Sequence, residues 1–246
     1  MSVKAAILAG GKGTRFRPYT DVLAKSMMPI GEGEKPLIEH VISWLSRHGI
    51  RDIVLLIGHH GNQIINYFRD GDRWGVRIRY SEDDEGYTGT GGSLLKAYDR
   101  GLIKDDDTVL VWYGDILARV DVRDLLEKHH QSKADATVVV ATRYRLPVGV
   151  AELEGDDIVK LVEKPWYPVK ATIGVLVLEA GILGGVGRVL GKQFDIMSDL
   201  IPRMIREGMR VKAYQYDGPW YDVGSMDRYA KLSPRKLREE FGDFIV

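Results

Sequence analysis

Short, mostly apolar runs alternate with amphipathic segments through roughly the first 145 residues, and this alternation restricts the possible folds more than any other feature. The runs at 3–8, 52–57, 108–112 and 136–142 lack the polar alternation of a half-exposed strand. Continuous apolar strands are typical of parallel sheets, which are covered on both faces. The alternation therefore predicts an α/β, Rossmann-like fold with a mostly parallel, mixed sheet flanked by helices.

The pattern changes after about residue 145. The segments 148–153, 158–162 and 173–178 are predicted as strands with short links, and Gly155-Asp156 as a hairpin turn. We expect a small antiparallel section inserted into or beside the main sheet. Helices are expected around 63–69, 94–99, 122–131, 194–206 and 225–239, and a glycine-rich loop at 82–92. The chain 1–246 is interpreted as one domain with parts at about 1–145 and 146–225 and a C-terminal helix at about 225–240.

Composition excludes several classes of protein. The 35 basic residues balance the 35 acidic ones, which argues against a nucleic-acid or polybasic membrane surface. With no cysteine, the chain has no thiolate nucleophile, disulfide or thiolate metal site. The apolar run at 5–9 is too short for a signal peptide, and no stretch reaches the roughly 18 apolar residues of a membrane span. We expect a cytoplasmic protein; the excess of arginine over lysine favours a thermophilic source.

A glycine loop directly follows the first predicted strand. Gly10, Gly11 and Gly13 allow a ligand to approach the backbone, successive N–H groups there can bind an anion, and Arg15 adds a cationic fork. Ligands bind beyond the carboxyl ends of such strands, so the loop predicts a phosphate site. It is neither a Walker A loop, because Ala6 stands where the first glycine belongs, nor a dinucleotide fingerprint, because Phe16 replaces the third. From the glycines alone, a turn without a ligand remains an equal alternative.

The whole string is more specific than its glycines. Residues 8–15, followed by Pro18, Thr20 and Lys25, resemble the signature of sugar-1-phosphate nucleotidylyltransferases, roughly L-A-G-G-x-G-T-R-L-x-P-L-T and then P-K-P. Here both prolines around Lys25 are replaced and the lysine stays. Further motifs of that family follow in the same order, and the resemblance extends from residue 3 to about 230. They are Gly89-Thr90-Gly91-Gly92-Ser93, Tyr113-Gly114-Asp115, Glu163-Lys164-Pro165, Thr172-Ile173-Gly174 and Trp220-Tyr221-Asp222-Val223-Gly224-Ser225.

The resemblance implies a reaction of a nucleoside triphosphate with a sugar 1-phosphate to give a nucleoside diphosphate sugar and pyrophosphate, with Mg²⁺ held by Asp115 and Asp222. It implies a nucleotide-binding part at about 1–145 and a sugar-binding part at about 146–225. The implied catalytic residues are Arg15, Lys25, Asp115, Lys164 and Asp222. The implied nucleotide contacts are Leu8, Gly10, Gly11, Gly13, Thr14, Gly89, Thr90 and Gly114. The implied sugar contacts are Gly149, Glu163, Lys164, Thr172 and Gly174.

The implied chemistry needs no general base. A phosphate monoester has a second pKa near 6 and is mostly ionised at neutral pH, so positioning and charge stabilisation suffice. Pro165 favours an extended backbone at Lys164. The histidine pairs at 59–60 and 129–130 are interpreted as surface residues, because adjacent side chains point apart and chelate poorly.

Several alternatives stay open. The base is best guessed as that of GTP, UTP or CTP, and the sugar phosphate as mannose or glucose 1-phosphate. No C-terminal β-helix is expected, so any homo-oligomer would form through the catalytic domain. The chain could instead be an inactive regulator that binds nucleotide sugars. It could also transfer to a non-sugar phosphate such as phosphocholine or inositol phosphate.

Overall fold

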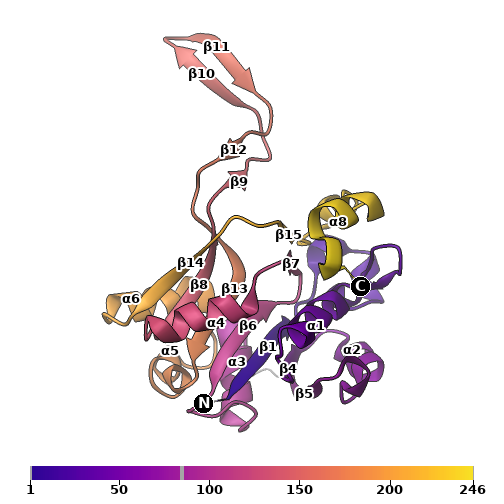
Figure 1. The fold of residues 1–246 in the computed structure, drawn as a ribbon, viewed down its shortest axis with the longest axis vertical. Coiled ribbons are helices and arrows are strands. Elements are labelled where there is room, and N and C mark those ends of the chain that lie inside the picture. Colours follow the sequence, from indigo (N-terminus) through magenta and orange to yellow (C-terminus); the bar gives the residue numbers. More distant parts are fainter. Residues whose placement is uncertain (1, 84–85, 246) are drawn as a thin grey trace.

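The central feature of the molecule is a seven-stranded mixed sheet in the order β14-β8-β13-β6-β1-β4-β5 (Figure 1). A computed structural model describes residues 2–83 and 86–245. Parallel pairs join β1 to β4 and β6, β4 to β5, and β8 to β14, whereas β13 is antiparallel to both of its neighbours. The fold class predicted from the sequence is therefore confirmed. The strands are β1 (Val3–Ala9), β4 (Asp52–Ile57), β5 (Arg77–Glu82), β6 (Thr108–Tyr113), β8 (Ala136–Ala141), β13 (Ala171–Glu179) and β14 (Val211–Tyr216).

Helices cover both faces of the sheet, and alternate residues of each strand serve opposite faces. In β1, Ala5 and Ile7 pack into one core and Ala6 into the other. The first core includes α1, α2, α4 and α8, and the second includes α3 and α6. None of the described helices is long and apolar enough to cross a membrane. The helices are α1 (Leu37–Arg47), α2 (Gly61–Phe68), α3 (Gly89–Asp99), α4 (Val122–Gln131), α5 (Arg188–Leu190), α6 (Ile201–Arg206), α7 (Met226–Tyr229) and α8 (Pro234–Phe241).

The strand predicted at 173–178 is β13, which lies antiparallel inside the main sheet rather than beside it. Two other predicted elements differ in the structure. The loop predicted at 82–92 ends earlier, because α3 already begins at Gly89; residues 84–85 of that loop lie outside the described residues. The helix predicted at 225–239 is two helices, and Ser233 caps the second by accepting from the Lys236 N–H at 3.2 Å.

A two-stranded arm projects from the body of the molecule (Figure 1). It consists of β10 (Val150–Glu154) and β11 (Asp157–Val162), which are antiparallel and joined by the predicted Gly155-Asp156 turn. Below it, β9 (Tyr144–Arg145) pairs with β12 (Trp166–Tyr167) and forms the stalk of the arm. Two further short pairs lie in the body: β2 (Pro29–Ile30) with β3 (Lys35–Pro36), and β7 (Ile116–Ala118) with β15 (Trp220–Asp222).

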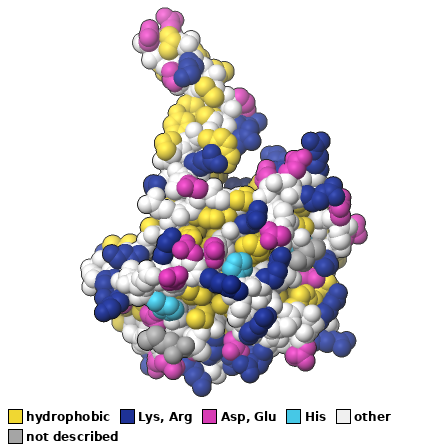
Figure 2. All heavy atoms as spheres, viewed as in Figure 1, with side chains coloured by type: hydrophobic (Ala, Val, Ile, Leu, Met, Phe, Trp, Pro, Cys, Tyr) yellow, Lys and Arg dark blue, Asp and Glu magenta, His cyan; other side chains and the backbone are white. Residues whose placement is uncertain are grey.

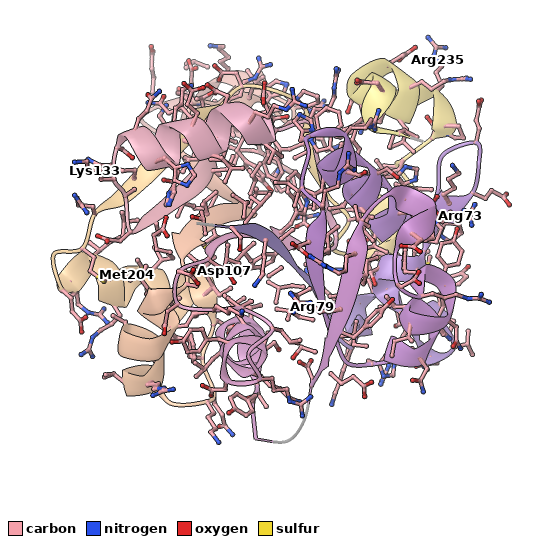
Figure 3. The ribbon with its side chains drawn as sticks, turned by 60° about the horizontal axis from the view of Figure 1, so that its bottom comes forward. Arg73, Arg79, Asp107, Lys133, Met204 and Arg235 are labelled. Atoms are coloured by element: carbon pink, nitrogen blue, oxygen red, sulfur yellow. The ribbon has the colours of Figure 1, made fainter. Side chains whose placement is uncertain are left out.

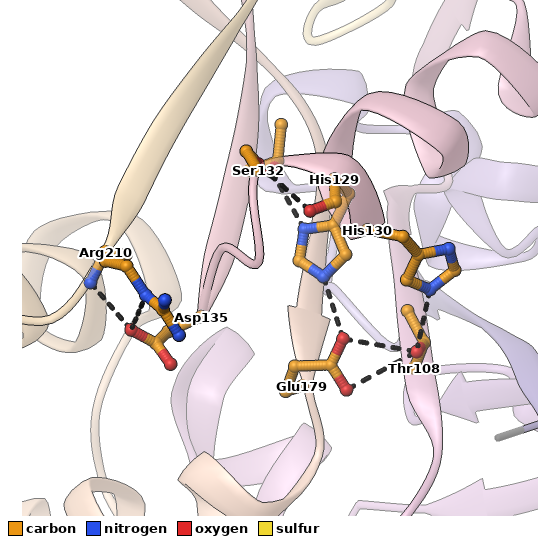
Figure 4. Close-up of polar contacts among 8 residues, drawn as sticks. Thr108, His129, His130, Ser132, Asp135, Glu179 and Arg210 are labelled. Carbon is orange, nitrogen blue, oxygen red and sulfur yellow. Dashed lines mark hydrogen bonds and ion pairs between the residues drawn. The ribbon is translucent and has the colours of Figure 1, made fainter.

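The edge where the parallel strands begin carries buried polar contacts. Figure 3 views the molecule from this side, where Asp107 precedes β6 and pairs with the buried Lys4. Nearby, His129 is fully buried between the Thr137 hydroxyl at 2.8 Å and the Glu179 carboxylate at 2.9 Å (Figure 4). Burial lowers the pKa of His129. The surface interpretation is therefore wrong for His129, which is a satisfied core residue, while His130 is exposed.

Candidate active site

A cavity of about 480 Å³ opens at the carboxyl ends of β1 and β6, and we call it the first cavity. The glycine loop bounds it after β1, the Gly114-Asp115 step bounds it after β6, and the start of α3 bounds a third side. This is the edge at which open α/β sheets bind ligands. The lining residues are Leu8, Ala9, Gly10, Gly11, Lys12, Lys25, Ser26, Leu56, Asp83, Tyr87, Thr88, Gly89, Thr90, Ser93, Tyr113, Gly114, Asp115 and Asp195.

Most of the residues predicted for the nucleotide line this cavity. They are Leu8, Gly10, Gly11, Gly89, Thr90 and Gly114. Gly13, Thr14 and Arg15 lie further along the glycine loop and outside the lining, and the Arg15 side chain is exposed. Lys12, which the motif comparison did not assign, is the cation of the loop that lines the cavity.

The glycine loop folds back onto the segment that carries Lys25. Gly13 has a left-handed backbone (φ 60°), and a Cβ there would lie 2.8 Å from the Thr20 Cγ2 and 3.1 Å from the Lys25 Cβ. The Thr20 hydroxyl donates to the Gly13 carbonyl at 2.8 Å. Glycine at position 13 therefore lets the loop pack close enough to position Lys25 beneath it.

Lys25 pairs with Asp115 at the floor of the first cavity, and its Nζ lies 2.5 Å from the Asp115 Oδ2. Asp115 reaches this position because the Gly114 N–H donates to the Leu8 carbonyl at 2.9 Å, which closes the ends of β1 and β6 together. A Cβ at Gly114 would lie 2.7 Å from the same carbonyl oxygen. Glycine is thus required at position 114, which precedes Asp115 in the chain.

The second predicted carboxylate, Asp222, lies on β15, which pairs with the strand β7 that directly follows Asp115. In the β7–β15 pair Asp222 faces Ile116, and the Val223 N–H donates to the Asp115 carbonyl at 2.9 Å. The Asp222 carboxylate forms an ion pair with Arg228 of α7. The structure therefore brings Asp115 and Asp222 to adjacent backbone positions, each neutralised by its own cation.

A second cavity of about 380 Å³ lies between the stalk of the arm and the C-terminal helices. Its lining combines aromatic rings with more cations than carboxylates, which suits an anionic ligand with an apolar face. Asp222 lines this cavity and Asp115 lines the first, so the carboxylate pair stands between the two. The lining residues are Tyr144, Arg145, Leu146, Pro147, Lys164, Trp166, Trp220, Tyr221, Asp222, Arg228, Lys231, Lys236 and Glu240.

The residues predicted for the sugar are less closely grouped. Lys164 lines the second cavity, and its Nζ lies 2.9 Å from the Glu163 carboxylate at the base of the arm. Gly149 packs against Glu163, whose Oε2 would lie 2.9 Å from a Cβ at that glycine. Thr172 and Gly174 lie on β13; Gly174 (φ 74°) leaves room for the Tyr113 ring. The extended backbone expected at Lys164 is wrong, because its φ is 49°.

The glycines at the start of α3 serve close packing. A Cβ at Gly89 would lie 2.4 Å from the Phe194 carbonyl oxygen. The Thr90 N–H and hydroxyl both donate to the Asp195 carboxylate, at 2.9 and 3.0 Å. Burial raises the pKa of Tyr113, whose protonated hydroxyl donates to the Thr90 Oγ1 at 3.5 Å. Asp195 therefore fixes the wall of the first cavity, and the motif comparison did not identify it.

Asp83 is a second lining residue that sequence reasoning missed. Its Oδ1 accepts from the Ser93 hydroxyl at 2.7 Å, and its Oδ2 lies 2.4 Å from where a Cβ would stand on Gly10. A signal was available in the loop predicted at 82–92, because Asp83 in that loop directly follows the carboxyl end of β5 at Glu82. For Asp195 the sequence offered no such signal.

The donor set suits a metal ion that also binds substrate phosphates. Within residues 2–83 and 86–245, no three His, Asp or Glu side chains form a group that could hold a metal by themselves. Mg²⁺ commonly takes one or two carboxylates together with phosphate oxygens, and Asp115 and Asp222 would supply such a pair.

A glycine loop and paired carboxylates at the carboxyl edge of the sheet are features of α/β proteins that bind phosphorylated ligands. The nucleotidyl transferase family model matches residues 4–239, and the chain belongs to this family. The family resemblance inferred from the motifs is thereby confirmed.

Relatives agree with this assignment, and solved structures share the fold. The chain is 31% identical over 242 residues to a UTP–glucose-1-phosphate uridylyltransferase of Synechocystis; the match covers 92% of the chain but 61% of that relative. It is 28% identical to a glucose-1-phosphate adenylyltransferase of Bacillus thuringiensis, over 96% of the chain and 68% of the relative. A Bacillus anthracis protein named as a glucose-1-phosphate thymidylyltransferase, solved with sucrose, superposes with a TM-score of 0.74 at 24% identity, covering 96% and 95% of the two chains. HddC from Yersinia pseudotuberculosis, solved with GMP-PN, gives 0.70 at 21% identity, covering 95% and 99%.

Proposed function

We propose that the protein transfers a nucleoside monophosphate from a nucleoside triphosphate to a hexose 1-phosphate, releasing pyrophosphate. The observation that supports this most is the position of Asp115 and Asp222 between two cavities of different character. One cavity has a glycine loop and Lys25, suited to a triphosphate; the other has aromatic rings and Lys164, suited to a sugar phosphate. The names of the relatives support the same reaction class.

The reaction is a displacement at the α-phosphorus. An oxygen of the sugar phosphate attacks, a new P–O bond forms, and the bond to the leaving pyrophosphate breaks. The attacking oxygen is already ionised, so the chain's residues only position and neutralise charge. Lys25 neutralises the α-phosphate, and Lys164 holds the sugar phosphate. Arg15, which is exposed and lies beyond the cavity lining, would hold the β- and γ-phosphates.

Asp115 and Asp222 would hold Mg²⁺. That ion supplies charge neutralisation between the two phosphates when it is bound. In the structure, Lys25 and Arg228 balance these carboxylates. With Asp115 and Asp222 holding the ion, the two cations would neutralise phosphate oxygens, so that charges stay paired in this partly buried site.

Asp83 favours guanine among the bases left open. A carboxylate only accepts hydrogen bonds, and guanine presents two adjacent donors, N1–H and N2–H, on its Watson–Crick edge. Uracil, cytosine and adenine each present an acceptor beside their donor, which a carboxylate repels. GTP is therefore the first candidate, with UTP or CTP next, while mannose and glucose 1-phosphate remain the candidate acceptors.

The test is pyrophosphate release from purified protein with Mg²⁺, each common nucleoside triphosphate, and a panel of hexose 1-phosphates. One efficient pairing would establish the reaction and both substrates. Binding of nucleotide sugars without pyrophosphate release would contradict the proposal and indicate a regulatory protein. Release only with phosphocholine or inositol phosphate would contradict the sugar assignment.

A further inference from the structure

Lysines and arginines are interspersed with acidic side chains over the body of the molecule, so charge does not mark a further binding site on the face shown in Figure 2. Buried polar groups are more informative, because a buried hydroxyl without a hydrogen-bond partner lowers stability and calls for an explanation. Among the described residues, the hydroxyls of Ser26 and Ser81 are two such groups. Of these two residues, only Ser26 lines the first cavity.

Ser26 directly follows Lys25 and stands where the family motif P-K-P has its second proline. The residue is only 4% exposed, and its hydroxyl has no hydrogen-bond partner in the part of the chain that the structure describes. Proline has no hydroxyl. This chain therefore places a hydrogen-bonding group at a point of the cavity wall where the motif has none.

The backbone that leads into Lys25 is held by α2. The Gln63 Oε1 accepts from the Ala24 N–H at 2.9 Å, and the Gln63 Nε2 donates to the Val22 carbonyl at 2.7 Å. These two bonds resist a shift of the segment that would bring Ser26 a partner from the chain. A molecule that binds in the first cavity can supply the partner instead.

The chemistry of the cavity indicates which kind of atom this partner is. Two lysines, Lys12 and Lys25, line the cavity and suit a ligand rich in anionic oxygens. Ser26 follows Lys25, which we expect to neutralise the α-phosphate. A serine hydroxyl donates readily to such an oxygen, and it can turn toward a ligand by rotation about one bond, without movement of the backbone.

We propose that Ser26 is a nucleotide-binding residue, whose hydroxyl donates a hydrogen bond to a ribose or α-phosphate oxygen of the bound nucleoside triphosphate. The inference rests on the proposed function, because it takes the first cavity to be the nucleotide site. Ribose and α-phosphate are common to nucleotides of every base, so Ser26 strengthens binding without selecting the base. Its role differs in this respect from that of Asp83.

Equilibrium binding of nucleotides to Ser26→Ala tests the contact. Isothermal titration calorimetry with GTP, UTP, CTP and ATP, without a sugar phosphate, gives the Kd of each. Loss of one hydrogen bond should raise the Kd about 5- to 10-fold for every nucleotide that the wild-type protein binds. An unchanged Kd in Ser26→Ala, or a change confined to one base, would overturn the proposal.

Ser81→Ala is the matched control. Ser81 lies on β5, is 2% exposed and also has an unpaired hydroxyl, but it lies outside the lining of the first cavity. Its replacement should leave every Kd at the wild-type value. Because neither hydroxyl is bonded within the described chain, both alanine variants should unfold at the wild-type urea concentration or above it. A lower midpoint for Ser26→Ala than for Ser81→Ala would indicate a structural role and contradict the proposal.

These measurements separate the contact from the proposed reaction. Weaker binding in Ser26→Ala would support the contact even if the wild-type protein released no pyrophosphate. Unchanged binding together with normal pyrophosphate release would overturn the contact alone. A wild-type protein that bound no nucleoside triphosphate would overturn both.

The dideoxy form of the tightest-binding nucleotide identifies the oxygen. It lacks both ribose hydroxyls and keeps all three phosphates. A loss of affinity in Ser26→Ala that persists with the dideoxy nucleotide would place the partner on the α-phosphate. A loss that is seen only with the parent nucleotide would place it on the ribose.

Discussion

At the scale of single residues, the proposed site contains two carboxylates, Asp115 and Asp222, and each forms an ion pair with a basic side chain. We expect Asp115→Asn and Asp222→Asn each to lower kcat by about 100-fold or more, as expected when a metal clamp is lost. Both pairs are partly exposed, so the fold should survive, with an unchanged circular dichroism spectrum. Pyrophosphate release at increasing Mg²⁺ concentration measures the effect.

The control for these variants is Asp52→Asn. Asp52 also pairs with an arginine, Arg77, but it starts β4 at the opposite edge of the sheet. Its loss should leave kcat unchanged. If Asp115→Asn and Asp222→Asn both kept normal Mg²⁺-dependent activity, the proposed metal site would be wrong.

Asp83 is the residue that we expect to select the base of the nucleoside triphosphate. Asp83→Asn replaces an acceptor with a group that also donates, so the preference for guanine should weaken. We expect the ratio of kcat/KM for GTP to that for UTP to fall about 10- to 100-fold, the discrimination that a two-bond contact to a base edge provides. Ser93→Ala, which removes only the hydroxyl that supports Asp83, should shift the ratio less in the same direction. An unchanged ratio in Asp83→Asn would remove Asp83 from base selection.

Sequence motifs identified glycines that the packing of the backbone requires. A Cβ at Gly10 would lie 2.4 Å from the Asp83 Oδ2 and one at Gly114 would lie 2.7 Å from the Leu8 carbonyl oxygen, and such constraints leave a local signature in the sequence. Asp195 and Arg228 were missed because they act through contacts with Thr90 and Asp222 that only the folded chain creates. No spacing or periodicity encodes those contacts.

At the scale of elements, α3 depends on how closely it packs on the segment around Phe194. Gly91 lies in the first turn of α3, and a Cβ there would lie 2.1 Å from a buried atom of the Phe194 ring. Alanine normally stabilises a helix relative to glycine, but here the overlap dominates. We therefore expect Gly91→Ala to lower the free energy of unfolding by about 1–3 kcal/mol, the usual cost of overpacking.

Urea denaturation measures this cost, and Gly185→Ala is the matched control. Gly185 is also a helical glycine, but no atom outside its own turn lies within 4 Å of a Cβ placed there. Its replacement should leave stability unchanged or raise it slightly. Equal effects at the two glycines would contradict the packing explanation.

The sequence predicted the parallel strands and missed the role of one antiparallel strand. An apolar run reports that a strand is buried on both faces, and β1, β4 and β6 satisfy this rule. The sequence also predicted β13 as antiparallel, but an apolar run does not identify the neighbours of a strand, so the position of β13 between β6 and β8 was left open.

At the scale of the whole molecule, the two edges of the sheet have different tasks. The glycines and carboxylates of the proposed site gather where the parallel strands end, whereas buried ion pairs and His129 stabilise the edge where they begin. The proposed binding site and these stabilising contacts are thus separated in space. A variant at the edge where the parallel strands begin should change the stability of the protein with little effect on the proposed reaction.

The stability of the protein should decrease in acid, because the folded chain keeps buried histidines in the neutral form. Burial lowers the pKa of His40, on α1, from 6.5 to about 4, and it also lowers that of His129. Below about pH 6.5 these histidines bind protons in the unfolded chain but stay neutral in the folded chain. The free energy of unfolding therefore decreases as the pH is lowered to about 4. At about pH 5, His40 alone should have lost about 2 kcal/mol of the free energy of unfolding that it contributes at neutral pH.

Chemical denaturation at neutral pH and at about pH 5 measures this loss. His40→Gln should reduce the difference between the two pH values by about 2 kcal/mol, whatever its effect at either pH alone. His130→Gln, at an exposed position, should leave the difference as in the wild-type protein. Because each variant is compared with itself at two pH values, a general loss of packing at position 40 cancels. If His40→Gln showed the same difference between the two pH values as the wild-type protein, the loss of stability in acid would come from other groups. His129 would then be the next residue to replace.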